Sequence, residues 1–184
     1  KRVVFIFSGG RRDRLNENNK YAKDFFYGYF GIKDKHPLTK VIEIEHEKTF
    51  LLSFIDKFLR KLINFPVAFS SIFNKKLKYE TENADVIVLV NESVMFYSLP
   101  YLYLLKKRNK DLKILLFTMG LFSKINERNK RKLLQLFVIK RMCLKIIDRF
   151  LFLGKGEYVF ASKKFNIFED KFKFTPFGID TEFW

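Results

Sequence analysis

The sequence predicts a doubly wound α/β fold, in which helices cover a parallel β-sheet on both faces. Short runs of β-branched and aromatic residues alternate along the chain with longer stretches of helical pattern. Several of these runs are apolar throughout, which is typical of strands buried in a parallel sheet. Hydrophobic residues make up 48% of the 184 residues, so the chain can bury a core and does not belong among disordered proteins.

Six segments have the character of strands, and they alternate with helical segments. Their residues are 3–7, 40–45, 85–90, 113–118, 149–153 and 172–174. The second alternates apolar and polar residues, so we expect it to be more exposed than the first. Right-handed crossovers would join the six into one parallel sheet.

Helices are expected between the strands. The first should begin after the polar stretch 11–19 and run to about Phe30, where Gly31 would end it. Others are expected at 50–65, from a cap at 91–93 to about Arg108, at 123–147 and at 157–165. In the helix at 50–65, the spacing of Phe54, Phe58 and Leu62 predicts a broad apolar sector opposite a charged one.

The chain is strongly basic, with 36 Lys and Arg against 20 Asp and Glu and a net charge of +16. Such a field attracts phosphates, anionic lipid head groups or nucleic acid. The single cysteine, Cys143, excludes an internal disulfide and favours a reducing, cytoplasmic location. No secretory signal follows Lys1-Arg2, and charges interrupt the apolar region 50–73, so a membrane span is not expected.

Ligands of doubly wound sheets bind beyond the carboxyl ends of the strands. After the first strand, Gly9 and Gly10 offer bare backbone amides, while Arg11 and Arg12 offer guanidinium groups. Such a loop suits a diphosphate, although neither the dinucleotide fingerprint nor a P-loop is present. An ordinary turn with solvated arginines is the alternative. For the polar residues at 91–93, helix capping is the alternative to a binding role.

Two segments near the end of the chain carry a family resemblance. Residues 176–183 (PFGIDTEF) resemble the Pro-Asn-Gly-Val-Asp-x-x-x-Phe segment of GT-B glycosyltransferases, above all the retaining enzymes of family four. Residues 148–157, followed by Phe165-Asn166-Ile167, look like Asp-x-Ile-Ile-x-x-Ser-x-x-x and then Phe-Gly-Ile of the same family. The resemblance implies that residues 1–175 form a Rossmann-like acceptor-side domain. Residues 176–184 would begin the linker to a C-terminal donor-binding domain outside this chain.

The resemblance implies retaining transfer of a hexosyl unit from a nucleotide sugar to a carbohydrate or lipid-linked acceptor, without a metal or another cofactor. Gly9 and Gly10 match the glycine loop that lies against the donor diphosphate. The acceptor side would be lined by Arg11, Arg12, Asn16, Glu17, Asn91, Glu92, Thr118 and Met119. No catalytic residue is expected within these 184 residues, which alone should be inactive. Met119 stands where many members carry His, Phe177 where they carry Asn, and Gly154 where they carry Ser.

Two helices also carry basic residues beside apolar ones, as helices that lie on anionic membranes do. The basic residues are Arg131, Arg141 and Lys145 in one helix, and Lys57, Arg60 and Lys61 in the other. This pattern predicts peripheral contact with the inner membrane face. The alternative is that the apolar residues pack on neighbouring helices and the basic ones are solvated.

A binding module without catalysis is the second functional class. One version is an acceptor-binding subunit with a separate donor subunit, as in bipartite N-acetylglucosaminyl transferases. The other is a basic nucleic-acid-binding domain. The sequence carries no helix-turn-helix, zinc-finger or RNA-recognition motif, which disfavours nucleic acid as a partner.

Overall fold

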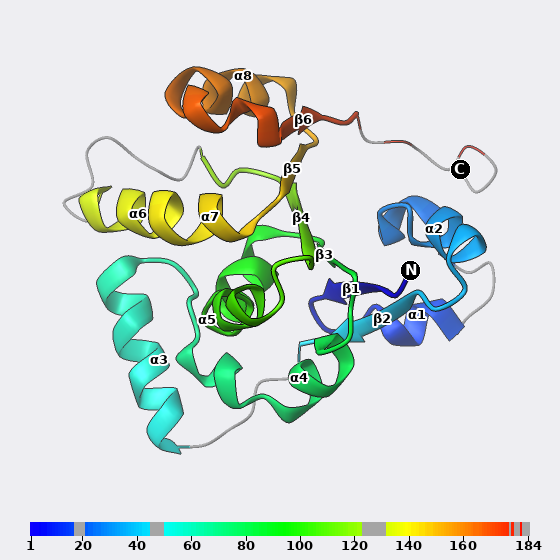
Figure 1. Ribbon diagram of the computed structural model, residues 1–184, viewed down its shortest axis with the longest axis horizontal. Helices are drawn as coiled ribbons and strands as arrows, with labels where there is room; N and C mark the ends of the chain where they lie inside the picture. Colours follow the sequence, from blue (N-terminus) through cyan, green and yellow to red (C-terminus); the bar gives the residue numbers. More distant parts are fainter. Residues whose placement is uncertain (17–20, 45–49, 123–131, 177, 179–180, 182–184) are drawn as a thin grey trace.

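The computed structural model describes residues 1–16, 21–44, 50–122, 132–176, 178 and 181, without the side chains of Asn16 and Phe50. Six parallel strands form one sheet in the order β2-β1-β3-β4-β5-β6 (Figure 1). The strands are β1 Val3–Phe7, β2 Lys40–Glu43, β3 Val86–Leu89, β4 Lys113–Thr118, β5 Arg149–Phe152 and β6 Phe172–Phe174. The predicted all-parallel α/β fold is confirmed as a Rossmann-like sheet flanked by helices.

Helices connect the strands. The α-helices are α1 Arg12–Asn16, α2 Tyr29–Lys35, α3 Phe50–Ile63, α4 Lys75–Thr81, α5 Glu92–Arg108, α6 Lys132–Val138, α7 Leu144–Ile146 and α8 Lys155–Lys164. Short 3₁₀ segments are η1 Lys23–Phe26, η2 Phe69–Phe73 and η4 Asn166–Lys171, and a π-helical turn, η3 Ile139–Cys143, joins α6 to α7. Within the described residues, no helix is both long enough and apolar enough to cross a bilayer.

The chain reverses its direction across the sheet between β1 and β3. It moves from β1 to β2 on one side, then returns past β1 to form β3, and afterwards adds β4, β5 and β6 in order. The loops after β1 and β3 therefore lead away from each other. A crevice is expected between them, because this switch in strand order is where doubly wound folds bind ligands.

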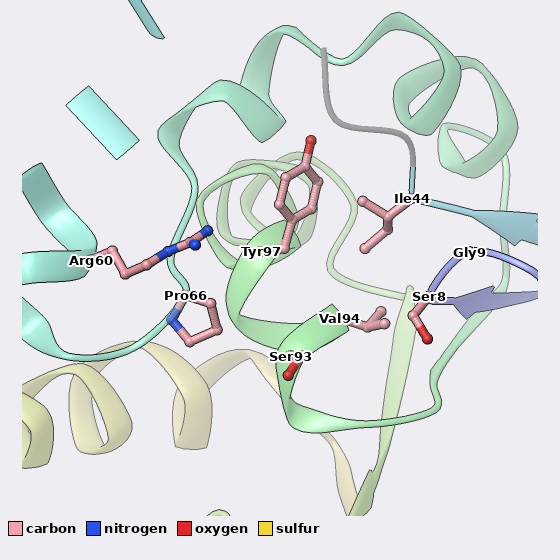
Figure 2. A pocket seen from close by; sticks show the side chains of 8 residues that line it. All are labelled: Ser8, Gly9, Ile44, Arg60, Pro66, Ser93, Val94 and Tyr97. Atoms are coloured by element: carbon pink, nitrogen blue, oxygen red, sulfur yellow. The ribbon is translucent and has the colours of Figure 1, made fainter. Parts of the chain in front are cut away.

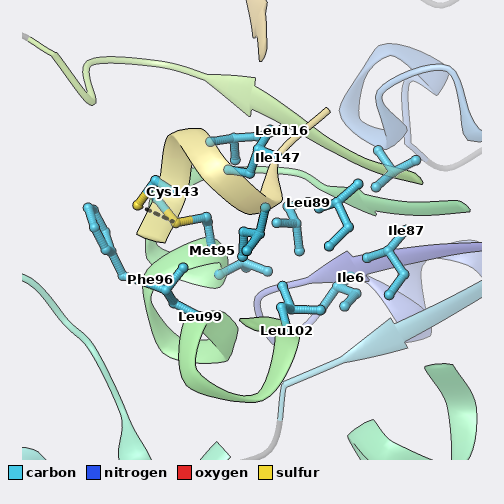
Figure 3. Packing of buried hydrophobic residues seen from close by; sticks show 14 of the residues in the cluster. Ile6, Ile87, Leu89, Met95, Phe96, Leu99, Leu102, Leu116, Cys143 and Ile147 are labelled. Carbon is cyan, nitrogen blue, oxygen red and sulfur yellow. Dashed lines mark hydrogen bonds between the residues drawn. The ribbon is translucent and has the colours of Figure 1, made fainter. Parts of the chain in front are cut away.

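A row of apolar side chains crosses the centre of the sheet. The strand register places Ile6 beside Leu89, Leu89 beside Leu116, and Leu116 beside Phe150. All four side chains are fully buried. Leu99 and Leu102 of α5 belong to the same core, which Figure 3 shows in part with Ile6, Leu89 and Leu116, so burial of apolar surface fixes α5 on β3 and β4.

Cys143 belongs to the same core. Its Sγ lies 3.6 Å from Sδ of Met95, and its side chain is fully buried. Burial raises the pKa of the Cys143 thiol, because the apolar surroundings disfavour the thiolate. In the folded protein we expect Cys143 to react with an aromatic disulfide reagent roughly a hundredfold or more slowly than in urea-unfolded protein. Equal rates of absorbance increase with and without urea would contradict the burial.

The helices differ from the predicted ones in five places. The helix expected up to Phe30 is broken, because Tyr27 and Gly28 both adopt left-handed backbone angles (φ 52° and 76°), and Gly31 lies inside α2 instead of ending it. The predicted helix 123–147 contains a π-helical turn, and its first nine residues lie outside the described part. Helix α8 starts at Lys155, before the predicted Glu157. Helix α4 was not predicted, and α1 lies within the polar stretch 11–19, after which the first helix was expected to begin.

Candidate functional site

The loop after β1 borders open space at the carboxyl edge of the sheet. Gly10 has φ +84°, a backbone conformation that favours glycine. Gly9 has no such requirement. A Cβ atom added to either residue would have no atom within 4 Å. Packing within the chain therefore does not require these glycines, and a ligand has room to approach the backbone.

Glu43, at the end of β2, holds the next two residues of this loop. Its Oε1 accepts the backbone N–H groups of Arg11 and Arg12. Part of the amide array predicted for an anion is therefore used by an internal carboxylate. The guanidinium carbon of Arg11 lies 5.4 Å from the ring centroid of Phe25, and its Nη1 is buried without a hydrogen-bond partner among the described residues. Arg12 is exposed at the start of α1.

A cavity of about 170 Å³ lies beyond the carboxyl ends of β1 and β3, where the loops after the two strands separate (Figure 2). Ser8 and Gly9 line it from the end of β1, and Ser93, Val94 and Tyr97 line it from the first turns of α5. The remaining lining residues are Ile44, Arg60 and Pro66. Arg60, predicted as a membrane-surface residue, is thus also placed at this cavity.

Two sources of positive potential meet at the cavity. The N-terminus of the 17-residue helix α5 carries the positive end of its dipole. Asn91 caps it, because its side chain accepts the Val94 N–H at 2.9 Å. Arg60 contributes a guanidinium group, and Gly9 lines the cavity without a side chain. The arrangement suits an anion such as a phosphate group.

A second group of residues gathers around Tyr27, which sequence reasoning missed. Its ring packs against Phe7 and Phe117, with centroid separations of 6.2 and 5.1 Å, and its hydroxyl lies 3.9 Å from Sδ of Met119. Burial raises the pKa of the Tyr27 phenol; the charge of Arg11 lowers it and that of Glu92 raises it. Tyr27 therefore brings three predicted site residues into one neighbourhood. A Tyr-Gly pair inside an expected helix was the one available signal.

Glu92 and Thr118 lie beneath this edge and are buried. The Glu92 carboxylate accepts the backbone N–H of Met119. Thr118 Oγ1 has no hydrogen-bond partner among the described residues. In the loop after β4, the Glu157 carboxylate accepts the N–H groups of Gly120 and Phe122 at 2.7 and 2.9 Å. Glu43, Glu92 and Glu157 thus each hold a loop at the carboxyl edge.

The other predicted residues are only partly described. Asn16 ends α1, but its side chain is not described, and Glu17 and Arg131 lie outside the described residues. The expected linker at 176–184 is described only at Pro176, Gly178 and Thr181. The basic residues Lys57, Lys61, Arg141 and Lys145 are exposed.

The described part of the chain contains no group of three or more His, Cys, Asp or Glu residues that could hold a metal ion. Comparison with family models, curated proteins and solved structures finds no match to this chain. Function must therefore be inferred from the fold and from the carboxyl edge of the sheet.

Proposed function

We propose that this chain is the acceptor-side domain of a GT-B glycosyltransferase, which moves a hexosyl unit from a nucleotide sugar to a carbohydrate or lipid-linked acceptor at a membrane surface. The observation that carries the proposal is the cavity at the switch in strand order. There the open Gly9 loop, the start of α5 and Arg60 converge on a space suited to phosphate. The resemblance of residues 148–167 and 176–183 to family four supplies the reaction class.

Transfer from a nucleotide sugar releases a nucleoside diphosphate, so negative charge develops on the leaving group. Backbone amides, a helix N-terminus and a guanidinium group stabilise such charge without a metal ion. At about 170 Å³ the cavity is smaller than sites for whole drug-sized ligands, which occupy about 300–1,000 Å³. It would hold phosphoryl groups or one sugar, while a second domain would bind the nucleoside.

The neighbourhood of Tyr27 is the proposed acceptor side. The Tyr27 hydroxyl and the Arg11 guanidinium group offer hydrogen-bond donors suited to acceptor hydroxyls. Glu92 would act here as a support, because its carboxylate already accepts the Met119 N–H. Met119 itself is 42% exposed and lies at the surface of this edge.

The test is a radiolabelled sugar-transfer assay on the longest natural polypeptide that contains these residues, supplied with uridine and guanosine diphosphate hexoses. We expect transfer, and we expect Gly9→Ala to lower it about tenfold or more by crowding the donor diphosphate. Gly9→Ala should leave folding intact, because no atom lies within 4 Å of the added Cβ. Gly31→Ala on α2 is the matched control, since its Cβ also meets open space.

Two results would count against the proposal. One is the absence of transfer with every nucleotide sugar. The other is full activity in Gly9→Ala, which would place the donor elsewhere. The isolated 184 residues are expected to be inactive, so transfer by them alone would contradict the assignment of the donor site to a second domain.

An acceptor-binding subunit without catalysis is the second candidate. The Glu43, Glu92 and Glu157 carboxylates are consistent with it, because each accepts a backbone amide and holds a loop at the carboxyl edge. The two-domain enzyme shares this feature, so the donor-binding chain decides between them. Sugar transfer that requires a separately encoded donor-binding chain would support this candidate over the two-domain enzyme.

A further inference from the structure

Helix α3 turns a row of large apolar side chains toward solvent. Leu51, Phe54, Phe58 and Leu62 are between 47% and 72% exposed. At 100° per residue, these four positions lie within about 80° of one another around the helix. We call them the α3 stripe. Such a continuous exposed apolar row is unusual on a water-soluble surface and marks an interaction site.

The opposite side of α3 fixes the helix to the rest of the protein. The Asp56 carboxylate accepts hydrogen bonds from the backbone N–H and the hydroxyl of Ser70, at 3.2 and 2.5 Å. Ile63 is buried, and its carbonyl accepts the side-chain amide of Gln135 on α6 at 3.1 Å. The helix is therefore held by its inner side, and the fold does not need the α3 stripe for burial.

Basic residues border the stripe. Lys57, Arg60 and Lys61 follow around the helix from Phe54, and all three are exposed. The one acidic residue of α3, Asp56, is engaged by Ser70. The exposed surface of α3 is thus apolar and positively charged.

We propose that the α3 stripe docks this domain on an anionic lipid surface, with α3 parallel to the membrane plane. The stripe would enter the boundary between head groups and acyl chains, while Lys57 and Lys61 would contact lipid phosphates. The positive charge around the stripe favours an anionic lipid surface over a second copy of the chain as its partner. Two copies that met through α3 would bring their basic residues together, and each copy carries a net charge of +16.

The inference specifies the membrane surface named in the proposed function, but its test is independent of sugar transfer, because vesicle binding needs no catalysis. The test is co-sedimentation of the chain with phosphatidylcholine vesicles, with and without phosphatidylglycerol, at low salt. We expect binding that requires the anionic lipid. Phe54→Gln combined with Phe58→Gln should weaken it about tenfold or more, because two aromatic rings no longer leave water. Lys57→Gln combined with Lys61→Gln should weaken it about tenfold or more at low salt, and less as salt is added.

The matched control replaces exposed apolar residues elsewhere, Leu38→Gln combined with Ile167→Gln. These side chains are 66% and 84% exposed and lie outside α3, so the control should bind vesicles like the unmodified chain. Circular dichroism checks that all variants fold. Absence of binding to anionic vesicles overturns the proposal, as does a control that loses as much binding as the stripe variant.

A label on the stripe gives a second readout. Cys143 is buried, so an environment-sensitive fluorophore can be attached to Phe58→Cys or, as the control, to Ile167→Cys. We expect anionic vesicles to shift the emission to the blue for the label at position 58 and not for the label at position 167. Equal shifts overturn the proposal. So does a dimer in sedimentation velocity that the stripe variant abolishes, because the stripe would then bind a second copy.

Discussion

Phe122→Ala is expected to lower the free energy of unfolding by about 3–5 kcal/mol, the usual cost of removing a fully buried aromatic ring. The Phe122 side chain is fully buried. It lies against four other rings, with centroid distances of 5.2 to 6.1 Å; they belong to Phe150, Phe152, Phe165 and Phe172. The ring thus joins β5, β6 and the end of α8, and its removal leaves a cavity that these elements cannot fill without moving.

Urea unfolding followed by circular dichroism measures this loss. Phe54→Ala is the control, because Phe54 is 69% exposed and its ring should contribute about 0.5 kcal/mol or less. Equal losses in the two variants would contradict the described packing at Phe122. A near-zero loss for Phe54→Ala would also support the conclusion that folding does not need the α3 stripe.

The strands could be predicted from the sequence because their signal is local. Residues 3–7, 113–118 and 172–174 are strands with the predicted bounds. Each run is short, and a Gly or Pro stands two residues after it, so neighbouring residues determine its bounds. The parallel arrangement followed from the alternation with helices, because parallel strands need long crossovers.

The break in the first predicted helix depends on contacts distant in sequence, whereas helix α4 does not. Tyr27 adopts φ 52°, and its ring packs against Phe7 and Phe117. No local sequence pattern predicts that packing. Helix α4 had a local signal that was overlooked. Asn74 precedes it as a cap, and its side chain accepts the Leu77 N–H at 2.8 Å.

The location of the cavity could be predicted from the sequence, but the contacts of the residues around it could not. The rule that ligands bind beyond the carboxyl ends of the strands led to Gly9, and the cavity is found there. The acceptor of the Arg11 and Arg12 amides, Glu43, belongs to another strand and could not be inferred from spacing. Arg60 was assigned to the membrane surface from its helix alone, because only the packing of α3 brings it to the cavity.

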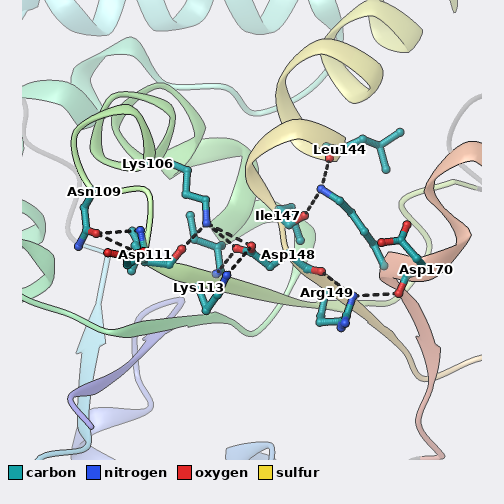
Figure 4. Close-up of polar contacts among 12 residues, drawn as sticks. Lys106, Asn109, Asp111, Lys113, Leu144, Ile147, Asp148, Arg149 and Asp170 are labelled. Atoms are coloured by element: carbon teal, nitrogen blue, oxygen red, sulfur yellow. Dashed lines mark hydrogen bonds and ion pairs between the residues drawn. The ribbon is translucent and has the colours of Figure 1, made fainter.

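Asp148→Ala is expected to lower the free energy of unfolding by about 2–3 kcal/mol, because one carboxylate joins three elements at the amino end of the sheet (Figure 4). Oδ2 of Asp148 lies 2.9 Å from Nζ of Lys106 on α5 and accepts the backbone N–H of Ile114 on β4 at 2.9 Å. The side chains of Lys106 and Asp148 are only 17% and 26% exposed. Removing the carboxylate leaves a largely buried ammonium group and a backbone amide without this acceptor.

A variant of Lys113, which also pairs with Asp148, tests whether the loss in Asp148→Ala comes only from attraction between surface charges. Nζ of Lys113 lies 3.8 Å from Oδ1 of Asp148, but the Lys113 side chain is 61% exposed. Solvent screens such a pair, so Lys113→Met should cost about 0.5 kcal/mol or less. Urea unfolding at low and high salt measures both variants. If Asp148→Ala cost no more than Lys113→Met, or if salt removed its effect, the carboxylate would act only as a surface charge and would not join α5 to β4.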